Sequence, residues 1–180
     1  MGTATMGIVT VRRANVEDAF AIAMIHVKTW RHAYRGQIPD HYLSSLSIDA
    51  RTKTWQEWLT NPQPDSDVLL AEIDSTTAGF CSVGKSRDED ADETRAHLYA
   101  LYVQPQYMNQ GLGSALIGAG VECLKRRGFR TATLWVLESN EPARRFYERK
   151  GWVLDGQTKA ETIQDFTLHE VRYCCSIPVA

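Results

Sequence analysis

The chain has 180 residues, 43% of them hydrophobic, and a formal net charge of −2, values that suit one domain with a sizeable core. The chain has no excess of positive charge that would indicate binding to nucleic acid, and no apolar run is long enough to span a membrane. Because no signal-peptide pattern opens the chain and the four cysteines show neither metal nor disulfide spacing, we expect a cytoplasmic protein without a metal site.

The first part of the chain predicts one strand followed by helices. Residues 7–13 alternate apolar and polar side chains, and Asn15 can cap the helix that follows. Five apolar residues then recur at spacings of three and four and predict one buried helix face: Phe20, Met24, Val27, Trp30 and Tyr34. A second helical stretch is expected from Pro39 to about Leu59, broken near Ser47.

The second part of the chain alternates strands with helices. Strands are predicted at 68–73, 78–85, 94–103, 131–137, 152–157 and 166–176. Helices are predicted from the glycines at 111–113 to Gly128 and over 141–150. This order predicts one α/β domain, residues 1–180, built on a mixed sheet.

The most informative stretch for function is the junction V-Q-P-Q-Y-M-N-Q-G-L-G-S at 103–114, which lies between a strand and a helix. Gly111 and Gly113 allow a tight turn and leave backbone N–H groups uncovered. The helix start adds its unpaired N–H groups and the positive end of its dipole. The junction therefore predicts an anion site for a phosphate or pyrophosphate.

Two well-known phosphate-binding patterns do not fit this junction. A P-loop needs a lysine where this chain has Ala119, and a dinucleotide fingerprint needs a third glycine where it has Leu116. What remains is Q-G-x-G-S-A followed by an apolar helix.

Two blocks of the sequence resemble the GCN5-related N-acetyltransferase (GNAT) family. They are H-L-Y-A-L-Y-V-Q-P-Q-Y-M-N-Q-G-L-G-S-A-L-I at 97–117 and L-W-V-L-E-S-N-E-P-A-R-R-F-Y-E-R-K-G-W at 134–152. The resemblance implies the acyl-CoA N-acyltransferase fold, a mixed and mostly antiparallel sheet of about seven strands flanked by helices. One departure is Met108, which stands at the first position of the family's Q/R-x-x-G-x-G/A signature and removes a usual polar phosphate contact.

The resemblance also implies where acetyl-CoA binds. The first block would hold its pyrophosphate and pantetheine, and the second would place an asparagine and a tyrosine near the thiol. An oxyanion-stabilising N–H is expected near Leu101. The expected cosubstrate-binding residues are Leu101, Tyr102, Val103, Met108, Asn109, Gln110, Gly111, Leu112, Gly113, Ser114, Asn140 and Tyr147. Asn140 is independently a plausible helix N-cap, and both roles can hold together.

The catalytic candidates are Tyr147 and His97. Tyr147 would protonate the departing thiolate, although packing against the sheet is an alternative role. His97 lies on the strand 94–103, and strand alternation predicts that it shares a face with Tyr99 and Leu101. It could take the proton of the attacking amine, or be a histidine held by hydrogen bonds. Glu138 is a second candidate base. As a third possibility, the amine loses its proton directly to water, without a dedicated base.

The acceptor pocket is expected to include Trp30, Tyr34 and Tyr99, since W-R-x-A-Y-R-G-x-I-P resembles a segment of small-molecule members of the family. A core position for Trp30 and Tyr34 is equally compatible with the pattern. The acidic run from Asp88 to Glu93 lacks the glycine of a calcium loop. It predicts a solvated, mobile connection, with attraction of a cationic amine as the alternative.

The sequence thus predicts an enzyme that transfers an acetyl group from acetyl-CoA to a primary amine of a small molecule. The amine would attack directly in a ternary complex. A non-catalytic acyl-CoA-binding module and an O-acyltransferase remain alternatives. No nucleic acid, membrane or metal is expected as a partner, and a homodimer is expected by analogy alone.

Overall fold

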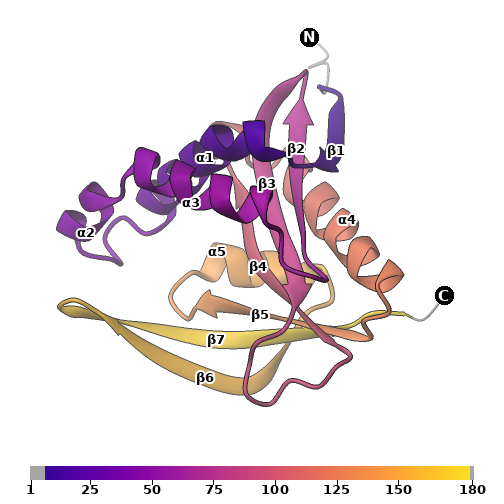
Figure 1. The fold of residues 1–180 in the computed structure, drawn as a ribbon. Helices are drawn as coiled ribbons and strands as arrows, with labels where there is room; N and C mark the ends of the chain where they lie inside the picture. Colours follow the sequence, from indigo (N-terminus) through magenta and orange to yellow (C-terminus); the bar gives the residue numbers. More distant parts are fainter. Residues whose placement is uncertain (1–6, 179–180) are drawn as a thin grey trace, which may run out of the picture.

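The computed structural model describes residues 7–178, which form a seven-stranded sheet with helices on both faces (Figure 1). The strands are β1 Val9–Arg13, β2 Asp67–Ile73, β3 Thr76–Lys85, β4 Arg95–Val103, β5 Thr131–Leu137, β6 Val153–Ile163 and β7 Phe166–Ser176. Their order across the sheet is β1-β2-β3-β4-β5-β7-β6. Neighbours pair antiparallel except β4 and β5, which are parallel. The predicted mixed, mostly antiparallel sheet is therefore confirmed.

Five α-helices and two short 3-10 turns connect these strands in the described part of the chain. The helices are α1 Ala19–Ala33, α2 Asp40–Ser45, α3 Ile48–Thr60, α4 Leu112–Arg126 and α5 Glu141–Arg149. The turns are η1 Val16–Asp18 and η2 Pro105–Tyr107. Asn15 caps η1 by accepting a hydrogen bond from the Glu17 N–H, and Ser47 begins α3 by accepting one from the Ala50 N–H. The Asn15 cap was predicted, whereas Ser47 was predicted only as the place where a helical stretch breaks.

Each face of the sheet has its own hydrophobic core. On one face, Leu112, Leu116 and Leu124 of α4, with Tyr147 of α5, pack against alternate residues of the central strands. On the other face, Ile22 and Ile25 of α1 and other residues of α1 and α3 pack against Leu70 and Phe80. The two layers of helices lie on opposite sides of the sheet in Figure 1.

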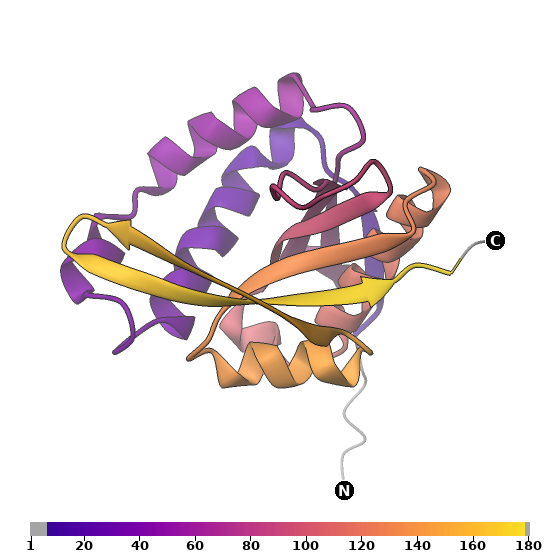
Figure 2. The same ribbon diagram turned by 90° about the horizontal axis from the view of Figure 1, so that it is seen from below.

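A third hydrophobic cluster closes one end of the molecule. The hairpin of β6 and β7 crosses the whole molecule in Figure 2 and reaches α2 at its turn. There Ile38 and Leu43 meet Leu137 of β5 and Leu168 of β7. The Tyr42 and Phe166 rings pack edge to face, with their centroids 5.0 Å apart. The segment after α1 is thereby held against the far end of the sheet.

The prediction for the buried face of the first helix was wrong in part. Phe20 is 55% exposed and Met24, Trp30 and Tyr34 are only partly buried, whereas Ile22, Ala23 and Ile25 are fully buried. The helix packs against both the sheet and α3, so its buried surface is wider than a single row of side chains. This surface is centred on Ile22, Ala23 and Ile25 and not on the predicted residues. Large aromatic residues at the predicted spacing instead lie at the edge of this contact.

The strand predicted at 152–157 is also longer in the structure, since β6 extends from Val153 to Ile163. Its second half is polar and almost entirely exposed. An edge strand held by backbone hydrogen bonds to a single neighbour requires no apolar alternation, so no periodic signal marked it.

Candidate active site

A cleft of about 1560 Å³ passes through the sheet where β4 and β5 separate. The two parallel strands pair over three positions, from Arg95 with Thr131 to His97 with Thr133, and then diverge. Tyr147 and Phe146, from the α5 face of the sheet, line this cleft together with Trp30 of the α1 face. The opening between two strands of one sheet thus joins the two helical layers.

A β-bulge in β4 reverses the alternation of its side chains beside this opening. Ala100 pairs with Ser82 of β3 and Leu98 pairs with Val83, so Tyr99 has no partner of its own. Leu98 and Leu101 consequently share the α4 face, although they are three residues apart. The prediction that His97 and Leu101 share a face was therefore wrong, because one extra residue flips every side chain after it.

The glycine loop places its backbone N–H groups at one end of the cleft. Gly111 is the N-cap of α4 and has a φ of 87°, a left-handed conformation that favours glycine. The N–H groups of Leu112, Gly113 and Ser114 follow in the first turn, where no intrahelical acceptor is available. A Cβ on Gly113 would lie 3.3 Å from the Phe146 ring of α5, so a small residue keeps the two helices close. This geometry can cradle an anion.

Most of the residues predicted to bind the cosubstrate line the cleft. These are Leu101, Tyr102, Val103, Met108, Asn109, Gly111, Gly113, Ser114, Asn140 and Tyr147. The side chains of Gln110 and Leu112 do not. The Gln110 amide donates to the Gln106 carbonyl at 3.1 Å, and Leu112 is part of the core at 1% exposure.

Tyr147 lies on the inner side of α5, among the Phe146, Trp152 and Tyr173 rings. It is 9% exposed and lines the cleft. Burial, with smaller effects from Tyr102 and Cys81, raises the pKa of its phenol far above the usual value near 10. The hydroxyl therefore keeps its proton at any physiological pH.

Asn140 is the N-cap of α5, as predicted. Its side-chain oxygen accepts a hydrogen bond from the Ala143 N–H at 3.3 Å. The residue also lines the cleft and lies beside the Tyr34 hydroxyl. A role at the helix start and a position in the cleft are thus compatible.

His97 is held rigidly at the point where β4 and β5 part. Its Nδ1 lies 2.8 Å from the Thr133 hydroxyl and its ring centroid lies 4.7 Å from that of Tyr99. Burial lowers the pKa of His97 to about 4, although Asp88 opposes this effect. The imidazole is therefore neutral near pH 7. Glu138, the other proposed base, does not line this cleft.

Aromatic side chains form the opposite half of the cleft. The Trp30 indole donates to the Tyr102 hydroxyl at 3.1 Å and packs edge to face on Tyr34, with centroids 5.0 Å apart. Tyr99 is 42% exposed and donates to the Lys85 carbonyl. Arg31, which follows Trp30 in α1, does not line the cleft and donates to the Leu43 and Leu46 carbonyls. The three predicted acceptor-pocket residues do meet in one cavity.

The prediction of a solvated, mobile acidic run between β3 and β4 was wrong in part, since most of the run is exposed but Asp88 and Asp90 are held by fixed contacts. Asp88 and Asp90 both accept hydrogen bonds from Arg172 of β7, at 3.0 and 2.7 Å. The other Asp88 oxygen accepts from the Trp135 indole at 3.0 Å. Although burial acts in the opposite direction, the hydrogen bonds from Trp135 and Arg172 lower the pKa of Asp88. Nothing in the sequence linked residues so far apart.

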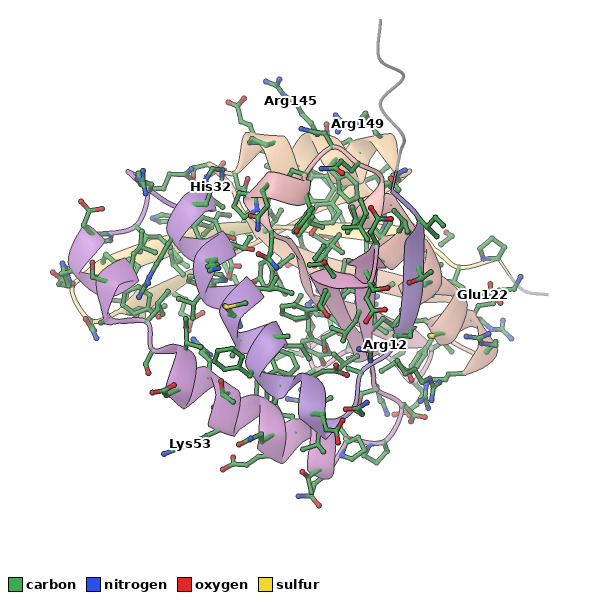
Figure 3. The ribbon with its side chains drawn as sticks, turned by 90° about the horizontal axis from the view of Figure 1, so that it is seen from above. Arg12, His32, Lys53, Glu122, Arg145 and Arg149 are labelled. Carbon is green, nitrogen blue, oxygen red and sulfur yellow. The ribbon has the colours of Figure 1, made fainter. Side chains whose placement is uncertain are left out.

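Basic side chains near the α5 end of the cleft were also missed. Arg145 and Arg149 of α5 line the cleft, together with Lys150 directly after α5 and His32 near the end of α1. Figure 3 shows Arg145 and Arg149 on one side of α5. Their spacing of four residues gave the only available hint, since it places two cations on one helix face.

Residues 7–178 contain neither a cluster of metal ligands nor a membrane-spanning helix. No group of three or more histidine, cysteine or acidic side chains there is arranged to hold a metal ion. Within the same range, every helix is too short or too polar to cross a bilayer.

The sequence matches the model of the acetyltransferase (GNAT) family over residues 27–152. The uncharacterised N-acetyltransferase YuaI of Bacillus subtilis is 35% identical over 142 residues, which cover 78% of each protein. A spermidine N(1)-acetyltransferase of Thermoplasma acidophilum is 24% identical over 163 residues, 87% of this chain and 96% of that protein.

The fold is similar to that of solved acetyltransferase structures. The PaiA N-acetyltransferase of Thermoplasma acidophilum, solved in complex with coenzyme A, superimposes with a TM-score of 0.74. The match covers 92% of this chain and 98% of that structure, at 21% sequence identity.

Proposed function

We propose, since this chain belongs to the GNAT acetyltransferase family, that it transfers an acetyl group from acetyl-CoA to a primary amine of a small molecule. The observation that carries this proposal is the single cleft that connects the α4 N-terminus to the aromatic pocket through the β4–β5 opening. Such a passage lets a donor and an acceptor approach each other from opposite faces of the sheet.

The half of the cleft next to α4 and α5, which we call the donor half, has backbone donors and positive charge for binding acetyl-CoA, a long anionic thioester. The free N–H groups at the start of α4 and the dipole of that helix would hold the pyrophosphate. Arg145 and Arg149 of the neighbouring α5, and Lys150 directly after it, add positive charge to this end of the cleft. The favourable charge offsets the missing polar contact at Met108.

The diverging strand β4 provides backbone groups for the acyl arm. Beyond His97, the edge of β4 that faces β5 has no partner strand, so its N–H and C=O groups point into the opening. These groups can pair with the pantetheine amides near Leu101 to Val103. An N–H of this segment would also stabilise the carbonyl oxygen as it gains negative charge during attack.

Tyr147 is the residue we assign to protonation of the leaving thiolate. It is buried, protonated and lines the cleft on the α5 side. A phenol whose pKa is raised is a weaker acid, but it never loses its proton before the thiolate forms. After transfer, the proton can be replaced from solvent through the cleft.

For the amine, we assign His97 the role of orienting the attacking nitrogen. A buried imidazole with a pKa of about 4 is a weak base for an ammonium group. As a neutral ring with Nδ1 bound to Thr133, however, it can accept a hydrogen bond from the amine. The ammonium proton would then leave to water before attack.

The proposed function is tested by acetyl-CoA binding and by CoA release. We expect isothermal titration calorimetry to show binding of acetyl-CoA to the purified protein. We also expect at least one amine from a panel of polyamines, amino acids, aminoglycosides and peptide N-termini to cause CoA release. No binding at millimolar acetyl-CoA would refute the proposal.

A second candidate function is a non-catalytic acyl-CoA-binding module, which the Met108 departure and the weakly basic His97 both favour. This alternative predicts acetyl-CoA binding without CoA release for every amine of the panel. The two functions are therefore separated by the second measurement.

A further inference from the structure

Arg172 is a buried cation that joins three separate segments of the chain. Its side chain, on β7, is 5% exposed. It donates to Asp155 through Nε at 2.7 Å and to Asp88 through Nη1 at 3.0 Å. It also forms a two-point contact with the Asp90 carboxylate, at 2.7 and 2.6 Å. A planar guanidinium suits such a fixed set of carboxylate contacts.

The three carboxylates differ in their relation to the cleft. Asp88 lines it, whereas Asp90 and Asp155 do not. Asp88 and Asp155 are otherwise closely matched, because both side chains are 19% exposed and each accepts one hydrogen bond from Arg172. Asp88 uses its second oxygen to hold the Trp135 indole, and Asp155 uses its second oxygen for the Gln157 N–H.

Trp135 is part of the same cleft wall. It pairs directly with Arg172 across β5 and β7, and the guanidinium carbon lies 5.5 Å from the ring centroid. The Lys159 ammonium lies 4.7 Å from the same ring. Since Leu134 and Val136 face the α4 side, Trp135 faces the α1 side, where the aromatic acceptor pocket lies.

We propose that Arg172 is a positioning residue for the acceptor: it fixes the Asp88 carboxylate and, through it, the Trp135 indole as one wall of the acceptor half of the cleft. This inference rests on the proposed function, because it assigns the amine to that half. A carboxylate held next to an aromatic ring is a suitable surface for an ammonium group. Without the Arg172 contact, the segment that carries Asp88 would lose its main attachment to β7.

The test compares Asp88→Asn with Asp155→Asn, which remove the same charge and the same kind of contact to Arg172. With saturating acetyl-CoA, KM is measured for spermidine and benzylamine by CoA release. We expect Asp88→Asn to raise the acceptor KM by roughly tenfold, while Asp155→Asn changes it by less than about twofold. The KM for acetyl-CoA should stay within about twofold of wild type in both variants.

A second measurement needs no acceptor. In ¹⁵N NMR spectra, the Trp135 indole N–H signal, assigned with Trp135→Phe, should shift or broaden in Asp88→Asn and in Arg172→Gln but not in Asp155→Asn. Equal acceptor KM values in the two aspartate variants, or an unchanged Trp135 signal in both Asp88→Asn and Arg172→Gln, would overturn the proposal. If neither amine is turned over, the NMR result decides.

Failure of this inference is distinct from failure of the proposed function. A protein that does not bind acetyl-CoA in calorimetry refutes the function. A protein that binds acetyl-CoA normally, but treats the two aspartate variants alike, refutes only the role of Arg172.

Discussion

Burial controls the ionisation of several side chains that line or adjoin the cleft. Tyr147 and Tyr34 keep their protons because their phenolates would be poorly solvated. For His97, the same effect favours the neutral ring. These three side chains therefore keep one protonation state near pH 7, which is compatible with the proposed transfer to an amine.

Replacement of Tyr147 by phenylalanine should lower kcat by about two orders of magnitude, the lower end of what one general acid contributes. The acetyl-CoA KM should change much less, because the ring and its packing remain. Steady-state kinetics with a turned-over amine, at a pH where chemistry limits the rate, provide the measurement. Phe146→Leu, which alters the neighbouring ring without removing a hydroxyl, is the control. An unchanged kcat in Tyr147→Phe would remove the general-acid role.

His26 predicts a loss of stability in mild acid. Its Nδ1 is buried and has no hydrogen-bond partner within residues 7–178, and its ring stacks on Tyr102 with a centroid distance of 5.2 Å. Burial, aided by the charge of Arg51, lowers the pKa of His26 to about 4. The unfolded chain, with a pKa near 6.5, binds the proton first. The free energy of unfolding should therefore fall as the pH decreases from about 6.5 to about 4, and be unaffected above this range.

Urea unfolding at several pH values tests this prediction. His26→Leu should lose less stability than wild type between neutral pH and about pH 4.5. His169→Leu, which replaces an exposed histidine, is the matched control. Parallel curves for His26→Leu and wild type would show that His26 contributes nothing to acid sensitivity.

At the scale of elements, the helix α4 depends on small residues where it approaches the sheet. A Cβ on Gly120 would lie 3.1 Å from a Val83 methyl group, whereas a Cβ on Gly118 would meet no atom within 4 Å. Gly120 is buried and Gly118 is exposed on the same helix. Only the face of α4 that carries Gly120 lies close enough to β3 for an added methyl group to matter.

Two glycine-to-alanine variants should consequently have opposite effects. Gly120→Ala should destabilise the protein by about 1–3 kcal/mol, because the added methyl overpacks the contact with β3. Gly118→Ala should stabilise it by roughly 0.5–1 kcal/mol, since alanine favours the helix and meets open space. Chemical denaturation measures both. A stabilised Gly120→Ala protein would show that α4 can move away from the sheet at no cost.

At the scale of the whole molecule, one end is closed by contacts between distant parts of the chain. Tyr42 of α2 packs on Phe166 at the start of β7, and His41 Nε2 lies 3.2 Å from an oxygen of Asp165. The Ser139 hydroxyl donates to the Gln37 side-chain oxygen at 2.6 Å. These contacts hold the segment after α1 over the sheet.

Phe166→Ala should weaken this closure. We expect a loss of about 2 kcal/mol of folding free energy, less than for a fully buried phenylalanine because Phe166 is only partly covered. Phe20→Ala, which truncates a 55% exposed phenylalanine, should change stability by less than about 0.5 kcal/mol. Thermal or urea unfolding of both variants is the measurement. Equal effects would mean that the Tyr42–Phe166 contact does not secure this end.

Much of the fold was predictable because its signals are local. The alternation of β1 and the apolar runs of β2, β3 and β5 marked these strands, and Asn15 and Asn140 marked helix starts through hydrogen bonds within three residues. The glycine loop at 111–113 was likewise a local feature, since positive φ and a following helix are both encoded nearby.

The rest depended on contacts that no local pattern contains. The bulge at Tyr99 exists only in the pairing of β4 with β3, and it decides which side chains face the cleft. The divergence of β4 from β5, which opens the sheet, is equally a relation between strands. Arg172 reaches Asp88 across 84 positions of sequence, so its role follows from the register of β7 with β5 and not from its neighbours in the chain.

By itself, therefore, the sequence determined most of the elements, the glycine loop that begins α4 and the resemblance to an acetyltransferase, because backbone propensity and capping act over a few residues. The tertiary structure alone decided that the sheet is open at β4 and β5, that His97 is buried and neutral, and that the acidic run is clamped by Arg172. Burial and pairing set these properties, and both arise only when distant segments pack together.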